Sequence, residues 1–371
     1  HMPPTAELLP TVVYSSYSDW QGPASFFAGE FFPHVETDGE IAARVAELTQ
    51  DLTSDEDRVR ALFLDVTTGV RNVYLNLGLG GYAPNDASQV LENKYADTRD
   101  KAVLLISMLR AAGIDAYPAL VSGLPDARFT ESVPTLKQFS RILVALPDGE
   151  SYRYLDPFLD DVSYGFVRWG RGNTALVVED DGTGVLAGVP AFRAAENHAR
   201  RVMDVSVDSN GDAAVRVSCD LTGYFDRKAR RDLKDATAPE EQKLFDTAAN
   251  LVSTGATDAG YSHSDLSDLT APVHMTQEID AEGFAVPQGD MMIVHLPPFP
   301  FSFASMDVYP SLAERRYPFE FPCEFTSDLE INLELPEGYS VVQIPEDTTF
   351  TTSDAVLSLT CESHEEQHIV V

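Results

Sequence analysis

Cysteine is scarce in this chain of 371 residues, which carries three: Cys219, Cys323 and Cys361. An odd and sparse set of cysteines argues against a disulfide framework, and the wide spacing of these three fits no zinc site. All three lie in the second half of the chain, where we expect each to be a small buried side chain in a strand.

Basic residues are also few, since 26 lysines and arginines face 59 aspartates and glutamates and give a formal net charge of −33. Such a charge repels phosphate backbones and anionic lipid, so the composition argues against nucleic acid as a partner. Only six of the basic residues are lysines. A surface rich in acids and poor in lysine favours a halophilic protein, whose charges are screened at high salt. An ordinary, very soluble acidic bacterial protein is the alternative.

Long apolar runs are missing too, and no stretch of the sequence is long enough to span a bilayer. No secretory signal precedes the first expected helix. The opening His1-Met2 is typical of a cloning remnant, so we expect the chain to be a fragment of a longer protein. With 44% hydrophobic residues the chain can bury a large core, and its length favours two or three domains.

The first half of the chain combines helical and strand patterns. Apolar residues at helical spacing predict a helix over 38–52 and another that begins at an N-cap, Ser54. A buried helix is predicted from Asp97 to about Ala112, with Gly113 ending it. Strand patterns follow at 116–121, 141–146 and 152–155.

After about residue 178 the pattern changes to short strands separated by proline and glycine. Strands at 201–207 and 213–221 are joined by a hairpin signal, Asp208-Ser209-Asn210-Gly211, and a helix begins at Pro239. We therefore predict an α+β protein with an N-terminal extension over 1–34, a core over 35–190, and a β-sandwich over 195–371 that carries a helical insertion at about 224–254.

The segment from Tyr95 to Leu105 reads Tyr-Ala-Asp-Thr-Arg-Asp-Lys-Ala-Val-Leu-Leu. It resembles the transglutaminase-like segment Tyr-Gly-Asp-Cys-Lys-Asp-Lys-Ala-Thr-Leu-Leu, in which the cysteine begins a buried helix and attacks an acyl group. Phe139-Ser140-Arg141-Ile142 resembles the strand that carries the family's histidine, and Leu155-Asp156-Pro157 resembles the segment of its orienting acid. The resemblance implies a papain-like core with Thr98, Arg141 and Asp156 at the three catalytic positions.

The resemblance extends over nearly the whole chain. Leu221-Thr222-Gly223-Tyr224, Glu314-Arg315-Arg316-Tyr317-Pro318 and Leu335-Pro336-Glu337-Gly338-Tyr339 are similar to the β-rich domain that follows the core in a group of bacterial exported proteins. That group commonly carries another β domain ahead of the core, for which this chain shows no counterpart. The resemblance implies a periplasmic or exported protein.

Two of the three catalytic positions have the wrong chemistry for acyl transfer. A threonine hydroxyl is a weaker nucleophile than a thiolate, and an arginine stays protonated and cannot accept its proton. Thr98 is either an unusual nucleophile or a residue that caps its own helix, and we favour the cap. Arg141 is either an anion clamp or the partner of Asp156 or Asp97 in an ion pair, and we favour the ion pair.

Other residues near these positions could line a cleft or hold an ion. Candidate cleft-lining residues are Tyr82, Tyr95, Asp97 and Trp169. Asp156, Asp160 and Asp161 form an acidic cluster that could bind calcium, but a solvated loop is the favoured interpretation, and we expect no metal and no cofactor. The aromatic segment 299–303 is expected to close one end of the β-sandwich, and a recognition edge is the alternative.

The sequence therefore predicts a catalytically inactive transglutaminase-like protein that binds or scaffolds peptide or protein segments in the former catalytic cleft. One alternative is an active acyl-transfer or peptidase-type enzyme with altered chemistry. Another is a structural spacer within a larger exported protein. Partners are expected to be protein or peptide, without nucleic acid or membrane insertion, and the oligomeric state stays open.

Overall fold

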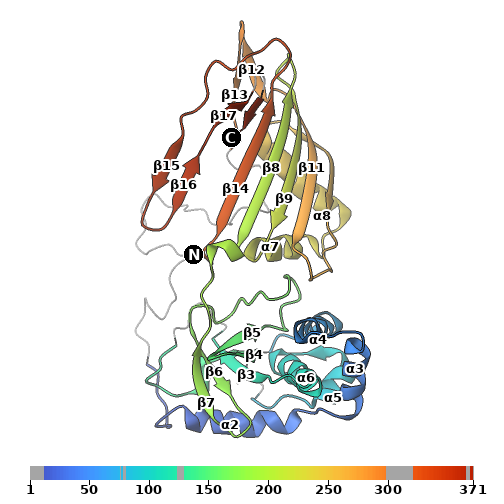
Figure 1. Cartoon of the computed structure of the whole chain (residues 1–371), viewed down its shortest axis with the longest axis vertical. Coiled ribbons are helices and arrows are strands. Elements are labelled where there is room, and N and C mark those ends of the chain that lie inside the picture. The colour runs from blue at the N-terminus through green and yellow to red at the C-terminus, as the bar shows by residue number, and fades with distance from the viewer. Residues whose placement is uncertain are drawn as a thin grey trace. The chain divides into compact units, whose positions relative to one another are not determined.

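The computed structural model describes residues 12–75, 77, 81–122, 129–297, 321–364 and 368–370. These residues form two compact units (Figure 1). Each unit has a hydrophobic core. The first comprises the described residues up to Phe192 together with Phe321 and Pro322, and the second those from Arg193 to 297 and from Cys323 onward. Within these ranges no helix has both the length and the apolar character that crossing a membrane requires.

Helices form one layer of the first unit (Figure 1). They are α2 (Gln21–Phe31), α3 (Gly39–Thr49), α4 (Asp55–Gly69), α5 (Ala87–Asn93) and α6 (Thr98–Ala111), with short 3-10 turns at Phe32–His34 and Leu136–Gln138. As predicted, Ser54 caps α4 by accepting a hydrogen bond from the Asp57 N–H. Gly113 follows α6 with a φ of 79°, which suits a glycine just past a helix end. Helix α6 is buried over most of its length because α3, α4, α5 and the sheet surround it.

A five-stranded antiparallel sheet forms the other layer, in the order β5-β4-β3-β6-β7. Side chains of β4 alternate between its faces: Ile142 and Val144 pack in the core with the helices, whereas Leu143 and Ala145 pack on the opposite face with Trp169. Both faces are therefore covered. The strands are β3 (Tyr117–Val121), β4 (Arg141–Asp148), β5 (Ser151–Leu155), β6 (Thr174–Val178) and β7 (Gly184–Gly188), with a short parallel pair, β1 (Arg71–Asn72) and β2 (Tyr95–Ala96), ahead of α6.

The second unit is built on a seven-stranded sheet in the order β10-β11-β9-β8-β14-β18-β17, in which β8 and β14 pair in parallel. Its strands are β8 (His198–Val207), β9 (Ala213–Leu221), β10 (Thr257–His263), β11 (Val273–Ala281), β14 (Thr326–Glu334), β17 (Glu362–His364) and β18 (His368–Val370). Two hairpins stand apart from this sheet: β12 (Ala285–Gln288) with β13 (Met291–Val294), and β15 (Thr348–Thr351) with β16 (Val356–Leu359). A 3-10 turn at Ala194–Glu196 precedes β8.

Two helices, α7 (Tyr224–Leu233) and α8 (Ala238–Val252), cover one face of this sheet. Phe225 of α7 and Phe245 of α8 pack in its core, and Gln277 of β11 donates a hydrogen bond to the Phe245 carbonyl. The α+β class is confirmed, and the helical insertion predicted at about 224–254 is present as α7 and α8. In the described residues these two helices cover a face of the large sheet that we expected a second sheet to cover. Alternating burial along a strand shows that one face is covered without showing what covers it.

The three cysteines are free thiols and all are buried. Cys219 lies in β9, as predicted, whereas Cys323 and Cys361 lie outside the strands. The aromatic segment at 299–303 and the motif at 314–318 fall outside the described residues.

Candidate functional site

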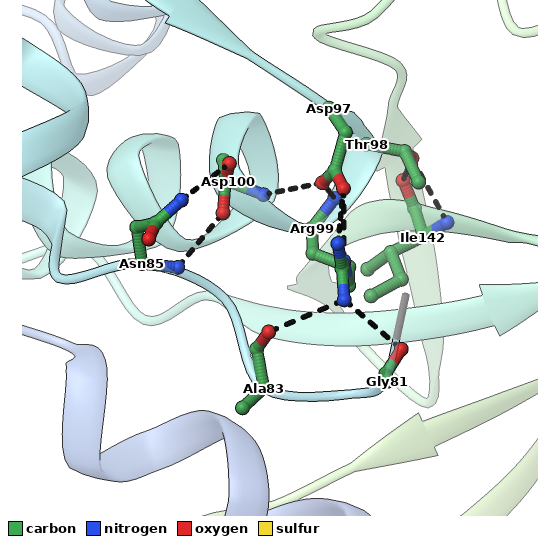
Figure 2. Close-up of polar contacts among 8 residues, drawn as sticks. All are labelled: Gly81, Ala83, Asn85, Asp97, Thr98, Arg99, Asp100 and Ile142. Carbon is green, nitrogen blue, oxygen red and sulfur yellow. Dashed lines mark hydrogen bonds and ion pairs between the residues drawn. The ribbon is translucent and has the colours of Figure 1, made fainter. Parts of the chain in front are cut away.

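Asp97 caps helix α6. Its backbone is extended, and its carboxylate accepts hydrogen bonds from the N–H groups of Arg99 at 2.8 Å and Asp100 at 3.2 Å (Figure 2). The prediction that Thr98 caps this helix is therefore wrong. Thr98 is already the first helical residue, and a side chain caps a helix from the position before the first turn.

The Thr98 hydroxyl is bonded to the backbone of β4 (Figure 2). Its Oγ1 accepts a hydrogen bond from the Ile142 N–H at 3.2 Å and donates one to the Ile142 carbonyl at 3.1 Å. Strand β4 pairs with β5 only from Val144 onward, where Val144 lies opposite Leu155. Ile142 lies two residues before Val144, so its peptide N–H and C=O point to the same edge of β4, beyond the end of β5. The hydroxyl therefore takes the place of a neighbouring strand, and Thr98 is only 2% exposed.

Arg99 fastens the preceding loop to the start of α6 (Figure 2). Its Nε donates to Asp97 Oδ2 at 3.0 Å, and its Nη1 donates to the carbonyls of Gly81 at 3.0 Å and Ala83 at 3.3 Å. Because Asp97 and Arg99 are both almost completely buried, this ion pair is part of the interior of the unit. The pair fixes the helix start relative to the loop.

Asp100, the residue after Arg99, holds the same loop at Asn85. Its carboxylate accepts hydrogen bonds from the backbone N–H of Asn85 at 2.8 Å and from the Asn85 side-chain amide at 3.0 Å (Figure 2). Burial raises the pKa of Asp100, and the bonds from Asn85 oppose that rise. The start of α6 is thus held by contacts with two remote segments, the loop before it and strand β4.

Arg141 lies against aromatic rings and not against a carboxylate. Its Cζ atom is 5.1 Å from the centroid of the Phe158 ring and 5.5 Å from that of Trp169. Within the part of the chain that the structure describes, the guanidinium makes no hydrogen bond and no ion pair. The expected ion pair with Asp156 or Asp97 is wrong, because Asp97 is bonded to Arg99 and aromatic rings flank Arg141.

Asp156 follows β5 and is 2% exposed. Its Oδ1 accepts a hydrogen bond from the Phe158 N–H at 3.2 Å, while its Oδ2 finds no hydrogen-bond partner in the described structure. Burial raises the pKa of Asp156 to about 6, although the Phe158 N–H and the positive charges of Arg141 and Lys101 oppose the rise. The carboxyl therefore titrates close to neutral pH.

Trp169 is positioned by the glycine that follows it. Gly170 has a φ of 75°, and a Cβ atom added there would come within 2.9 Å of the Val121 side chain on β3. A larger residue would be strained and would push this segment off the sheet. Glycine therefore allows Trp169 to pack on the sheet face that Arg141 shares with Leu143 and Ala145.

The remaining candidate residues lie in different places. Tyr82 packs edge-on against Phe26 and Phe27 of α2, and Tyr95 is 51% exposed. Of the four candidate cleft-lining residues, Trp169 is the one with a described contact to Arg141. Among the residues described, no three His, Cys, Asp or Glu side chains are arranged to hold a metal ion. The acidic cluster of Asp156, Asp160 and Asp161 is therefore not arranged as a metal site.

Two family models match parts of the chain. The sequence model of the Transglutaminase-like superfamily matches residues 42–139, an interval that contains α6 and ends before Arg141. The chain carries a transglutaminase-like domain. A second model, for a domain of unknown function with a solved structure (DUF3858), matches residues 290–371. No curated protein matches the sequence.

The fold is also found among solved structures. The chain is similar to the crystal structure of a "putative protease" from Parabacteroides distasonis ATCC 8503, with 13% sequence identity and a TM-score of 0.55. The similarity covers 96% of this chain and 52% of that chain, so this chain spans about half the length of the solved protein. At this level of identity the likeness shows the fold alone.

Thr98, Arg141 and Asp156, the positions that the sequence resemblance assigns to the catalytic residues, have no described bond between their side chains. A cysteine acyl-transfer enzyme needs a nucleophile, a base and an orienting acid in a hydrogen-bonded row. Here Thr98 is bonded to backbone and Arg141 lies against two rings. Of the three, Asp156 is the group able to exchange a proton near neutral pH.

The sequence analysis missed three residues that matter around Thr98, Arg141 and Asp156. The cap at Asp97 could have been found, because an aspartate directly before the first helical residue is a known signal. Phe158 lies two residues after Asp156, but nothing in the pattern indicates that its ring meets Arg141. Ile142 contributes through its peptide groups, which no side-chain pattern reveals.

Proposed function

We propose that the transglutaminase-like domain is catalytically inactive and binds an extended peptide or protein segment near its former catalytic positions. The observation that supports this most directly is the bonding of Thr98. Its hydroxyl donates to the Ile142 carbonyl and accepts from the Ile142 N–H, in a residue that is 2% exposed. A nucleophile must present a lone pair to its substrate and lose its proton to a base, and a peptide carbonyl is not such a base.

Arg141 adds to this proposal because a guanidinium stays protonated and cannot act as a general base. Loss of general base catalysis alone typically lowers a rate by about 10²–10⁴-fold. The replacement of the thiol lowers it further, since a neutral hydroxyl is a poor nucleophile at neutral pH. Conventional acyl transfer therefore needs a base and a nucleophile that these positions do not supply.

The rival proposal, an enzyme with altered chemistry, is favoured by one observation. Asp156 has a pKa raised to about 6 by its burial, and a carboxyl that titrates near neutral pH can serve as a base. Against this, Asp156 is 2% exposed and has no described bond to Thr98. We therefore rank the rival second.

Peptide is the proposed ligand class for two reasons. The solved structure with the same fold is described as a "putative protease", and a protease acts on peptide. In addition, a cleft that has lost its chemistry can keep the strand edges and side chains by which it held an extended chain. An exported location, as in the bacterial proteins that the sequence resembles, belongs to the same proposal.

The first test compares the wild-type protein with Thr98→Val and Thr98→Ser. Each protein is incubated with a glutamine-containing peptide, an amine donor and a mixture of short peptides, and products are identified by mass spectrometry. We expect the same product-free background in all three. A product formed by the wild type and the serine variant but not by the valine variant would contradict the proposal, because it would require a reacting Thr98 hydroxyl.

The second test combines Thr98→Cys with Arg141→His, which restores a thiol and an imidazole beside the unchanged Asp156. We expect this double variant to gain acyl transfer that neither single variant shows, and Asp156→Asn in the same background to reduce it. Circular dichroism establishes that each variant is folded. A folded double variant without activity would mean that the catalytic positions assigned from the sequence resemblance are wrong.

A further inference from the structure

Among the described residues, Arg141 has no carboxylate partner, in contrast to many other arginines of the first unit. The chain has 59 acidic residues for 26 basic ones, so acidic partners are plentiful. Arginine–carboxylate pairs among the described residues of this unit include Arg44–Asp65, Arg58–Asp55, Arg99–Asp97, Arg110–Asp180 and Arg153–Glu56. In the described structure Arg141 makes neither an ion pair nor a hydrogen bond, although it is a half-buried residue.

Two aromatic rings fix the Arg141 guanidinium and leave its hydrogen-bonding edge available. The Cζ atom lies over the rings of Phe158 and Trp169, at 5.1 Å and 5.5 Å from their centroids. Ring faces attract the cation without accepting its N–H groups as carboxylate oxygens do. A guanidinium has five N–H donors in a rigid fork, so a stacked arginine can bind a planar anion with little further loss of side-chain entropy.

A second guanidinium lies near the same indole. The Cζ atom of Arg168 is 4.4 Å from the centroid of the Trp169 ring, and Arg168 is exposed. The neighbouring carboxyl of Asp156 is buried and is not bonded to Arg141, so it leaves the guanidinium fork open.

We propose that Arg141, held against Phe158 and Trp169, binds the carboxylate group of a peptide ligand. This inference rests on the proposed function of the domain and names the chemical group by which the peptide is recognised. A carboxylate matches the fork of a single arginine with two parallel hydrogen bonds. A phosphate dianion fits less well, because a net charge of −33 opposes its approach more strongly than that of a monoanion.

The experiment uses the whole chain and three small probes. They are acetyl-Ala-Ala with a free C-terminal carboxylate, the same dipeptide as its C-terminal amide, and acetyl-Glu-Ala amide, whose carboxylate is on a side chain. Binding is read from the indole N–H signals in ¹H–¹⁵N spectra, of which the chain has two, from Trp20 and Trp169. Trp169→Phe assigns them. Trp20 lies in the core and donates to the Glu131 carbonyl, so its signal is the internal control.

We expect the free carboxylate to shift the Trp169 signal in a saturable way, and the amide to leave it in place. Affinity should fall about tenfold or more in Arg141→Gln and by less in Arg141→Lys, which keeps the charge but loses the fork. Arg216→Gln changes the net charge equally at an exposed position in the second unit and should bind as the wild type does. An unchanged Trp20 signal shows that Arg141→Gln is folded.

The responses to the three probes, and a parallel titration with inorganic phosphate, show whether Arg141 binds a carboxylate and which carboxylate it binds. A response to the free C-terminus or to the glutamate side chain supports the proposal and identifies the source of the carboxylate. Equal shifts with the amide, an unchanged affinity in Arg141→Gln, or tighter binding of phosphate would each overturn it. Catalysis that depends on Thr98 would contradict the proposed function and leave this binding result untouched, so the two can fail separately.

Discussion

Removing only the hydroxyl of Thr98, in Thr98→Val, should destabilise the first unit. The substitution keeps the shape of the side chain but removes the atom that bonds both the N–H and the carbonyl of Ile142, a residue that is 1% exposed. A buried polar group left without a partner costs about 1–3 kcal/mol. With two such groups, and less than about 1 kcal/mol regained from the added methyl, we expect the free energy of unfolding to fall by about 2–4 kcal/mol.

The assay is urea unfolding followed by tryptophan fluorescence. Both tryptophans of the chain, Trp20 and Trp169, lie in the first unit, so the signal reports on that unit. With an m-value of about 2 kcal/mol/M, the loss lowers the unfolding midpoint by about 1–2 M urea. Thr98→Ser is the matched control, since it keeps the hydroxyl and should lose only about 1 kcal/mol with its methyl. The reasoning is refuted if the valine variant is as stable as the serine variant.

Two further predictions concern charge. Because the pKa of Asp156 is raised to about 6 in the fold from an ordinary 3.8, its contribution to stability is present in full below about pH 4 and is lost as the pH rises through about 6. Asp156→Asn removes this dependence, so the free energy of unfolding of the variant relative to the wild type should increase by about 3 kcal/mol as the pH rises across this range. Arg141, Lys101 and Asp161 are the charged groups that act on this carboxyl. Parallel curves of unfolding free energy against pH for the two proteins would contradict the expectation. The net charge of −33 predicts that the melting temperature rises between ~0.1 M and ~1 M NaCl as repulsion is screened, and a melting temperature that stays constant in calorimetry would count against a halophilic protein.

Much of the fold could be predicted because its signals are local. Helix α4 begins after the serine that was expected to cap it, and β9 spans the predicted residues 213–221. Such boundaries depend on caps, turn residues and periodicity within a few residues of each other. The helical insertion at about 224–254 was predicted as well, and α7 and α8 lie in it. That these helices cover the large sheet could not be predicted, because strand periodicity is equally compatible with a covering sheet or covering helices.

In the candidate site, too, the identities of the residues could be predicted from the sequence but their contacts could not. The sequence placed Thr98, Arg141 and Asp156 at related positions through motifs, and it could state that threonine and arginine are poor replacements for a thiol and a base. It could not predict their partners. Thr98 bonds a peptide group 44 residues away, and the expected ion pair of Arg141 is replaced by contacts with two rings.

The sequence by itself determined the α+β class, the presence of the buried helix between Asp97 and Ala112, and the chemical limits of a threonine at 98 and an arginine at 141, since residue identity and spacing are enough for these. Only the tertiary structure decided that the Thr98 hydroxyl bonds the backbone of Ile142 and that Arg141 has no carboxylate partner in the described structure. Each of these depends on which remote groups come within a few ångströms of one another. That proximity is set by the packing of helix α6 on the sheet.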